Sequence, residues 1–188
     1  MIILPAKTKN MKNILFAIPA FLSIFLFTGC EKLKEQKFGV QLISDFVIDL
    51  NDGETSYSSE ELLSTLTNDD LAQYAENIKD YSLEKLSYKI WEYNGPDLAT
   101  IQGNLKIENP GAANDLVTID ITQALLFDLN AQEERTTVDL DQSDINKIVS
   151  YLQAGNEIRL KSEGLISESP AYMVLQVVMD LEATAKIK

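Results

Sequence analysis

The sequence predicts a mainly β protein: an antiparallel β-sandwich-like domain of about seven strands with two short helices, preceded by a cleaved signal helix. Two observations lead to this fold class. Several segments alternate apolar and polar residues with a period of two, which is typical of strands that bury one face and expose the other. Their spacing does not repeat, and no sustained strand–helix alternation indicates a parallel sheet. Two packed sheets, or one curved sheet covered by helices, would bury the apolar faces.

The segment from Met11 to Cys30 has the three parts of an export signal. Lys12 supplies a positive start. The apolar run from Ile14 to Phe27 is too short, and too one-sidedly flanked, for a stable membrane span. Small residues then lead to the only cysteine of the chain. The segment therefore predicts a signal peptide that is removed on export.

The residues Leu26-Phe27-Thr28-Gly29-Cys30 resemble the lipobox of bacterial lipoproteins, although Phe27 stands where leucine is usual. The resemblance implies cleavage before Cys30 by the lipoprotein signal peptidase and a diacylglycerol anchor on the Cys30 thiol. The alternative is a buried cysteine in an N-terminal helix, which the uniformly apolar run disfavours. We therefore expect an exported, membrane-anchored lipoprotein of the cell envelope, with the outer membrane as the favoured location. The membrane face stays open.

The lipobox divides the chain into residues 1–29 as signal peptide, residues 30–37 as a charged tether and residues 38–188 as a single β-rich domain. The length of the last part suits one domain with its own core. Met11-Lys12-Asn13 is a better signal start than Met1-Ile2-Ile3. The alternative is a start at Met1, in which Lys7 and Lys9 extend the positive region.

Charge excludes several partners. Three of the sixteen basic residues and none of the twenty-nine acidic ones precede Cys30, so thirteen basic residues face twenty-nine acidic ones after it, a formal net charge of −16. Nucleic-acid binding and electrostatic adsorption to anionic lipid both need a basic surface. We expect no nucleic-acid partner, and contact with the membrane only through the lipid on Cys30. The acidity itself is explained by solubility.

Missing residue types exclude most catalytic chemistry. The chain has no histidine and no thiol besides Cys30, so Cys-His and Ser-His-Asp nucleophiles and imidazole–thiolate zinc sites are impossible. Carboxylates remain, and the pairs Asp139/Asp141 and Glu133/Glu134 could in principle serve glycoside hydrolysis. Such pairs are expected in a chain this acidic. The sequence therefore predicts a protein that is not an enzyme and holds no cofactor.

The domain begins with one long predicted strand. From Phe38 to Leu50 the apolar residues share one parity, interrupted only at Ser44. Turn residues Asn51–Glu54 end this strand. The segment Thr55–Thr65 is rich in serine and threonine and has no clear period, so we expect a connection there.

The middle of the chain predicts a helix and a hairpin. A short amphipathic helix is expected at about Asp69–Lys79, because capping residues and two aspartates precede apolar residues at helical spacing. Alternating segments at Leu86–Ile90 and Ala99–Ile107 flank turn residues Asn94–Asp97. This pattern is typical of a β-hairpin.

The last third predicts more strands and a second helix. Apolar residues keep one parity from Val117 to Leu129 across a break, which predicts one bulged strand or two short ones. The second helix begins after Asp141 or Ser143 and ends at Gly155. Further strands are expected at Thr136–Leu140, Glu157–Glu163 and Met173–Ile187. Together, the lipobox and the strands resemble Gram-negative lipoproteins with immunoglobulin-like or related β-rich domains, a resemblance that implies no activity.

Trp91 and Tyr93 are the candidate partner surface. Their parity is opposite to that of Leu86, Tyr88 and Ile90, so on an unbroken strand both rings would stand on the outer face. There they could stack on a sugar ring or on a partner's side chain. The alternatives are a bulge near Trp91 that returns the ring to the core, or a helix that covers the face.

A cluster of oxygen ligands near the first turn is a weaker candidate. Asp45, Asp49, Asn51, Asp52 and Glu54 could hold Ca²⁺. Their register fails the EF-hand pattern, because apolar residues occupy ligand positions. We therefore predict an acidic turn and no metal site.

Two classes of non-catalytic function remain. The first is an interaction module that binds a protein or glycan partner in the cell envelope, for which an exposed patch is required. The second is a carrier or chaperone of a lipid or other apolar ligand, for which a pocket between sheet and helices is required. A structure inspected for an exposed aromatic face and for an internal cavity distinguishes them.

Overall fold

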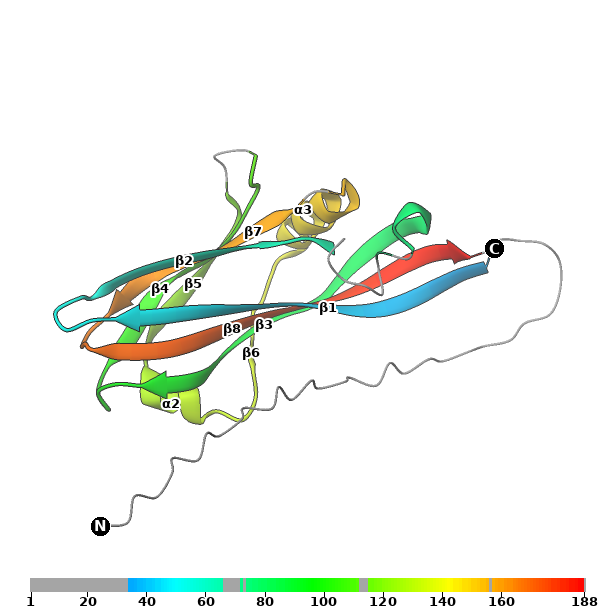
Figure 1. Ribbon diagram of the computed structural model, residues 1–188. Coiled ribbons are helices and arrows are strands. Elements are labelled where there is room, and N and C mark those ends of the chain that lie inside the picture. The colour runs from blue at the N-terminus through cyan, green and yellow to red at the C-terminus, as the bar shows by residue number, and fades with distance from the viewer. Residues whose placement is uncertain (1–33, 66–71, 73, 112–114, 156, 188) are drawn as a thin grey trace, which may run out of the picture. The chain divides into compact units, whose positions relative to one another are not determined.

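The structure is a computed structural model that describes residues 34–65, 72, 74–111, 115–155 and 157–187 (Figure 1). The chain divides between Lys32 and Leu33 into two units, and the fold below is that of the second unit. The predicted signal peptide and Cys30 lie outside the described residues. Within those residues, no helix has the length and apolar character that a bilayer crossing needs.

The described residues form eight strands, two α-helices and a 3₁₀ turn. In chain order these are β1 Lys34–Leu50, β2 Ser56–Leu63, η2 Ala75–Asn77, β3 Ile78–Asn94, β4 Thr100–Glu108, β5 Asp115–Leu125, α2 Leu126–Ala131, β6 Thr136–Thr137, α3 Gln142–Gln153, β7 Ile158–Ile166 and β8 Ala171–Ile187.

The strands form two antiparallel four-stranded sheets, which confirms the predicted β-sandwich-like fold. The first sheet has the order β1-β8-β3-β6 and the second the order β2-β7-β4-β5. The chain neighbours β1 and β2, β3 and β4, and β7 and β8 each belong to different sheets. The turns of these three pairs lie at the same end of the domain, the crossing end, on the left in Figure 1, and β4 and β5 alone among consecutive described strands share a sheet. This is the strand order of a jelly roll.

The strand order differs from the immunoglobulin arrangement that the sequence resemblance suggested. Immunoglobulin-type sandwiches place strands ABED in one sheet and CFG in the other, so their first two strands share a sheet. Here β1 and β2 do not. The immunoglobulin-like part of the resemblance is therefore replaced by a jelly-roll topology, a distinction that alternation alone cannot make.

The core lies between the sheets and is centred on β8. Every second residue of β8 from Met173 to Ala185 is at most 2% exposed, and the core positions of the other strands are mostly aliphatic, with Phe46, Tyr57 and Tyr81 among them. Two more β8 residues, Val174 and Val178, are buried on the outer side because neighbouring strands flank them. The long alternating run predicted at the C-terminus is confirmed as the central strand of its sheet.

The crossing end is fastened by hydrogen bonds between the sheets' connections. Ile166 N donates to Thr55 O at 2.8 Å, and Ser167 N donates to Thr100 O at 3.0 Å. Gly53 N donates to the Ser169 hydroxyl at 3.0 Å. The predicted hairpin between Leu86–Ile90 and Ala99–Ile107 is wrong, because the turn between these two segments carries the chain from one sheet into the other.

The second predicted helix is confirmed as α3. Asp141 Oδ1 accepts a hydrogen bond from Asp144 N at 2.8 Å and caps the helix, as its position suggested. The face with Ile148 and Leu152 is buried. Gly155, at φ +73°, follows the helix and donates to Leu152 O, a conformation that favours glycine. Both α2 and α3 contact β3 and β5, so they cover the side of the sandwich where these strands lie.

Four sequence-based predictions are corrected. The strand predicted to continue to Leu129 ends at Leu125, and α2 follows. In this helix Leu126 is buried and Phe127 is 55% exposed. The spacing of two between Leu125, Phe127 and Leu129 had suggested a strand instead. The Thr55–Thr65 connection contains edge strand β2, whose outer face is polar. The predicted helix at Asp69–Lys79 falls partly on residues outside the described ones, and its end is wrong, because η2 and β3 occupy that stretch.

The fourth correction concerns the tether. The sheet begins at Lys34, so residues 34–37, expected as a solvated tether, are paired with β8. The β-branched run Thr136–Leu140 contributes only the two-residue strand β6, with Val138 N donating to Leu86 O at 2.9 Å. The ends of strands were therefore predicted least accurately where the apolar stretch is short or lies next to charged residues.

The second sheet contains a close approach between two glycines. Gly103 of β4 and Gly164 of β7 lie directly opposite each other. A Cβ on Gly103 would stand 2.2 Å from Glu163 O, and one on Gly164 would stand 2.2 Å from Gln102 O. A side chain at either position would therefore force the strands apart.

Candidate binding groove around Trp91

Trp91 lies on the outer face of the β1-β8-β3-β6 sheet. Its side chain is 55% exposed, whereas the preceding residue, Ile90, is 2% exposed. In the pairing with β8, Ile90 stands opposite Leu175 and Glu92 opposite Val174, so Trp91 is an extra residue in β3. It forms a β-bulge. Trp91 therefore lies on the outer face, one of the positions that the sequence left open, although the strand is bulged there.

Tyr93 does not share this face, which corrects the predicted pair. The bulge at Trp91 reverses the parity of the strand, so that Tyr93 stands opposite the core residue Met173. Its ring packs against the core, and its hydroxyl donates to Pro96 O at 2.7 Å. Burial, with smaller effects of Asp97 and Glu168, raises the pKa of Tyr93. The bulge named as an alternative does occur, but it turns Tyr93, and not Trp91, toward the core.

A groove of about 620 Å³ runs along the sheet beside Trp91. Its floor is the outer face of this sheet, with residues of β1, β8, β3 and β6, and the segment that leads into β6 also lines it. Polar and charged groups dominate the lining, which consists of Gln41, Lys85, Ser87, Lys89, Trp91, Glu133, Glu134, Arg135, Thr137, Gln176, Val178 and Asp180.

Three cations of the groove have no carboxylate partner within the part of the chain that the structure describes. Lys89 Nζ donates to the carbonyl oxygen of Glu133 at 3.0 Å, and Arg135 Nη2 donates to Gln176 Oε1 at 2.6 Å. Lys85 stands opposite Asp180 in the ladder, without an ion pair within 4.0 Å. Their positive charge is therefore not neutralised by a direct ion pair in this domain.

The floor of the groove is held by side-chain amides. Gln176 accepts from Arg135 and donates through Nε2 to Asp45 Oδ1 at 2.9 Å. Gln41 Nε2 donates to Asp180 Oδ1 at 2.7 Å. The bonds to Asp45 and Asp180 each join the neighbouring strands β1 and β8, and the bond from Arg135 ties the segment before β6 to β8, so these side chains are already hydrogen-bonded before any ligand arrives.

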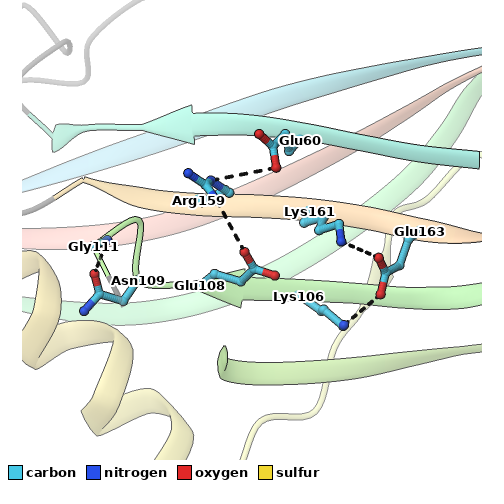
Figure 2. Close-up of polar contacts among 8 residues, drawn as sticks. All are labelled: Glu60, Lys106, Glu108, Asn109, Gly111, Arg159, Lys161 and Glu163. Carbon is cyan, nitrogen blue, oxygen red and sulfur yellow. Dashed lines mark hydrogen bonds and ion pairs between the residues drawn. The ribbon is translucent and has the colours of Figure 1, made fainter. Parts of the chain in front are cut away.

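The outer face of the other sheet is organised differently (Figure 2). Glu163 lies between Lys106 and Lys161, with its Oε1 2.7 Å from Lys106 Nζ and its Oε2 2.5 Å from Lys161 Nζ. Arg159 lies 3.9 Å from Glu60 and 3.9 Å from Glu108. Hydrogen bonds from Lys106 and Lys161 lower the pKa of Glu163 to about 2. The cations of this face are thus already satisfied.

The acidic side chains considered as Ca²⁺ ligands have other partners. Asp45 accepts from Gln176, and Glu54 Oε2 accepts from Asn51 N at 2.8 Å, which closes the turn after β1. Among the described residues, no group of three or more Asp, Glu, His or Cys side chains could hold a metal ion.

The two carboxylate pairs considered for glycoside hydrolysis differ: Asp139 and Asp141 have different surroundings, whereas Glu133 and Glu134 lie on the same groove. Asp141 caps α3. Asp139 lines a hollow beside β5, away from the groove. Glu133 and Glu134 lie on the groove, where the Glu133 carbonyl holds Lys89.

Sequence reasoning missed Arg135 and Gln176. Gln176 is the polar residue between Val174 and Val178 on the central strand, an interruption that marks a special position on an otherwise buried outer face. Arg135 carries no such signal, because its place beside β8 depends on how the segment after α2 returns to β3.

The hollows of the described surface bear on the carrier hypothesis. Besides the groove, they lie at the crossing end, beside the glycine pair, between β5 and β6, and below α3, and charged side chains line each of them. The last has a volume of only about 100 Å³. The apolar pocket that a lipid carrier requires has no counterpart among them.

Comparisons with known proteins found only distant structural similarity. No family model and no curated protein matches the chain. The solved structure of Desmodium yellow mottle tymovirus is similar at 12% identity with a TM-score of 0.41, covering 87% of this chain and 95% of that one. Turnip yellow mosaic virus at 100 K is similar at 12% identity with a TM-score of 0.30, covering 79% and 95%. Similarity this low carries no functional conclusion.

Proposed function

We propose that this protein is a lipid-anchored, non-catalytic binding module of the cell envelope, and that it binds its partner on the outer face of the β1-β8-β3-β6 sheet. The observation that carries this proposal is the exposed Trp91 beside a groove whose three cations have no ion-pair partner among the residues that the structure describes. Tryptophan and arginine are the residues most enriched where binding energy concentrates. The partner is a protein or a glycan.

The anchor part of the proposal rests on the lipobox residues that end at Cys30. Replacement Cys30→Ser should prevent acylation and leave the protein uncleaved by the lipoprotein signal peptidase. Labelling with radioactive palmitate measures this directly. Label in the Cys30→Ser protein equal to that in the parent would show that the lipobox interpretation is wrong.

The binding part is tested with the full lipidated chain immobilised in detergent. Envelope material is separated into a protein-free polysaccharide fraction and a polysaccharide-free protein fraction, and binding of each is measured by surface plasmon resonance. Trp91→Ala should weaken binding of one fraction about tenfold or more, the loss of roughly one well-placed contact.

Phe127→Ala is the matched control, because Phe127 is also 55% exposed but lies on α2. It should leave binding unchanged. Equal binding of both fractions to the parent and to Trp91→Ala would contradict the proposal.

A further inference from the structure

The composition of the groove defines the chemistry of its ligand. The lining is mostly polar, and Trp91 is its only aromatic residue. Protein interfaces usually have an apolar centre surrounded by a polar rim, which this groove does not provide. Its concave form and its volume of about 620 Å³ suit a small ligand or one segment of a linear polymer.

Charge selects among such ligands. In a chain whose residues after the lipobox cysteine carry a formal charge of −16, three of the thirteen cations gather on one groove. Among the described residues, Lys89 bonds to a carbonyl and Arg135 to an amide, and Lys85 forms no ion pair within 4.0 Å. A guanidinium with a neutral partner can still take a ligand carboxylate through its planar fork.

The three carboxylates of the groove restrict the ligand further. Glu133, Glu134 and Asp180 also line it, so the groove as a whole is formally neutral. A simple polyanion would be repelled by them. A sugar would not, because its hydroxyl groups donate hydrogen bonds to carboxylates while its acidic groups accept from lysine and arginine.

We propose that the groove binds an acidic oligosaccharide, with one sugar ring stacked on Trp91 and the ligand's carboxylates paired with Lys89 and Arg135. The inference rests on the proposed function and specifies its partner as a uronic-acid-type glycan. Gln41 and Gln176, fixed by their own hydrogen bonds, present a rigid floor on which the polymer lies.

The experiment titrates the full lipidated chain in detergent with tetragalacturonate and with its methyl ester. The two probes share the same rings, and only the first carries charge. Trp91 is the only tryptophan of the chain, so its emission reports occupancy of the groove. The acid should shift the emission to shorter wavelength and bind about tenfold or more tightly than the ester. Its affinity should fall as salt is added.

Variants locate the charge effect. Lys89→Gln/Arg135→Gln should weaken binding of the acid about tenfold or more and leave binding of the ester unchanged. The control Lys37→Gln/Lys147→Gln removes the same charge from exposed ion pairs elsewhere and should bind both probes like the parent. Thermal melting of each variant establishes that it is folded.

Each other outcome is decisive. Equal affinity for acid and ester would overturn the acidic specificity. No emission change with either probe, together with Trp91-dependent binding of the protein fraction, would overturn the glycan partner and leave the proposed function standing. No Trp91-dependent binding of any fraction would overturn both.

Discussion

The two outer faces of the sandwich carry similar residues and use them in opposite ways. On the β2-β7-β4-β5 sheet, Arg159, Lys161 and Lys106 each face a carboxylate, and Glu163 binds two of them at once. On the β1-β8-β3-β6 sheet, Lys89 and Arg135 bond to neutral groups. A face with internal ion pairs has little to offer a charged ligand, because a ligand would have to displace existing partners.

The difference begins in the central strands. The outer residues of β7 carry both signs, because Glu163 follows Arg159 and Lys161, and charged residues of β2 and β4 complete the ion pairs. On β8 the corresponding outer positions are the buried Val174 and Val178, with Gln176 between them. Lys89 and Arg135 lie beside this stretch of β8, which carries no carboxylate, whereas farther along the strand Glu182 pairs with Lys37. The outer face of a sheet can bind a charged ligand where the central strand provides no carboxylates for the neighbouring cations.

The glycine pair gives the sharpest test of how the two sheets differ. Gly164→Ala should lower the free energy of unfolding by about 3 kcal/mol, because the new Cβ meets a backbone oxygen that cannot move aside cheaply. Denaturant titration measures the change. Gly39→Ala on β1 is the control: its Cβ meets nothing within 4 Å, and the effect should stay within about 0.5 kcal/mol. Equal losses would show that the close approach is not what constrains the second sheet.

The ion pairs on the outer face of the β2-β7-β4-β5 sheet should make the stability of the domain sensitive to acid. The pKa of Glu163 in the folded state is about 2, below its ordinary 4.5. Its stabilising contribution is therefore fully present above pH 4.5 and is lost as the pH falls toward 2. Because the side chain is 29% exposed, solvent screening reduces this contribution to about 1 kcal/mol.

Glu163→Gln isolates that effect. The variant should be less stable than the parent at pH 7, and the difference should disappear near pH 2, as followed by unfolding curves at each pH. High salt should reduce the difference at pH 7. A difference that is constant over the whole range would show that the ion pairs do not stabilise this face.

The smallest expected change in stability belongs to the binding face. Trp91→Ala should alter the free energy of unfolding by no more than about 0.5 kcal/mol, because its ring is exposed beyond the bulge. Ile90→Ala, one position earlier and 2% exposed, should cost about 2–5 kcal/mol. The parent should show the red-shifted, quenchable emission of an exposed indole. A large loss of stability together with blue-shifted emission would place Trp91 in the core and exclude it as a ring on which a ligand stacks.

Local patterns in the sequence determined much of this molecule. The parity of β8 and the capped helix α3 with its stop at Gly155 both follow from period and capping chemistry. Each depends on residues within a few positions of one another, for which one strand or helix is a sufficient frame. The absence of histidine and of a second thiol likewise limits the chemistry without any structure.

Only the tertiary structure decided which strands share a sheet and what surrounds Trp91. Alternation is the same whether a turn closes a hairpin or carries the chain between sheets, so the segment after β3 was misassigned. The reversal at Tyr93 depends on one extra residue measured against β8, and a bulge exists only relative to a partner strand. Arg135 lies 41 positions before its hydrogen-bond partner Gln176 in the sequence, and the fold brings the two together at the groove. Such pairings are fixed by packing of the whole core and leave no periodic trace in the chain.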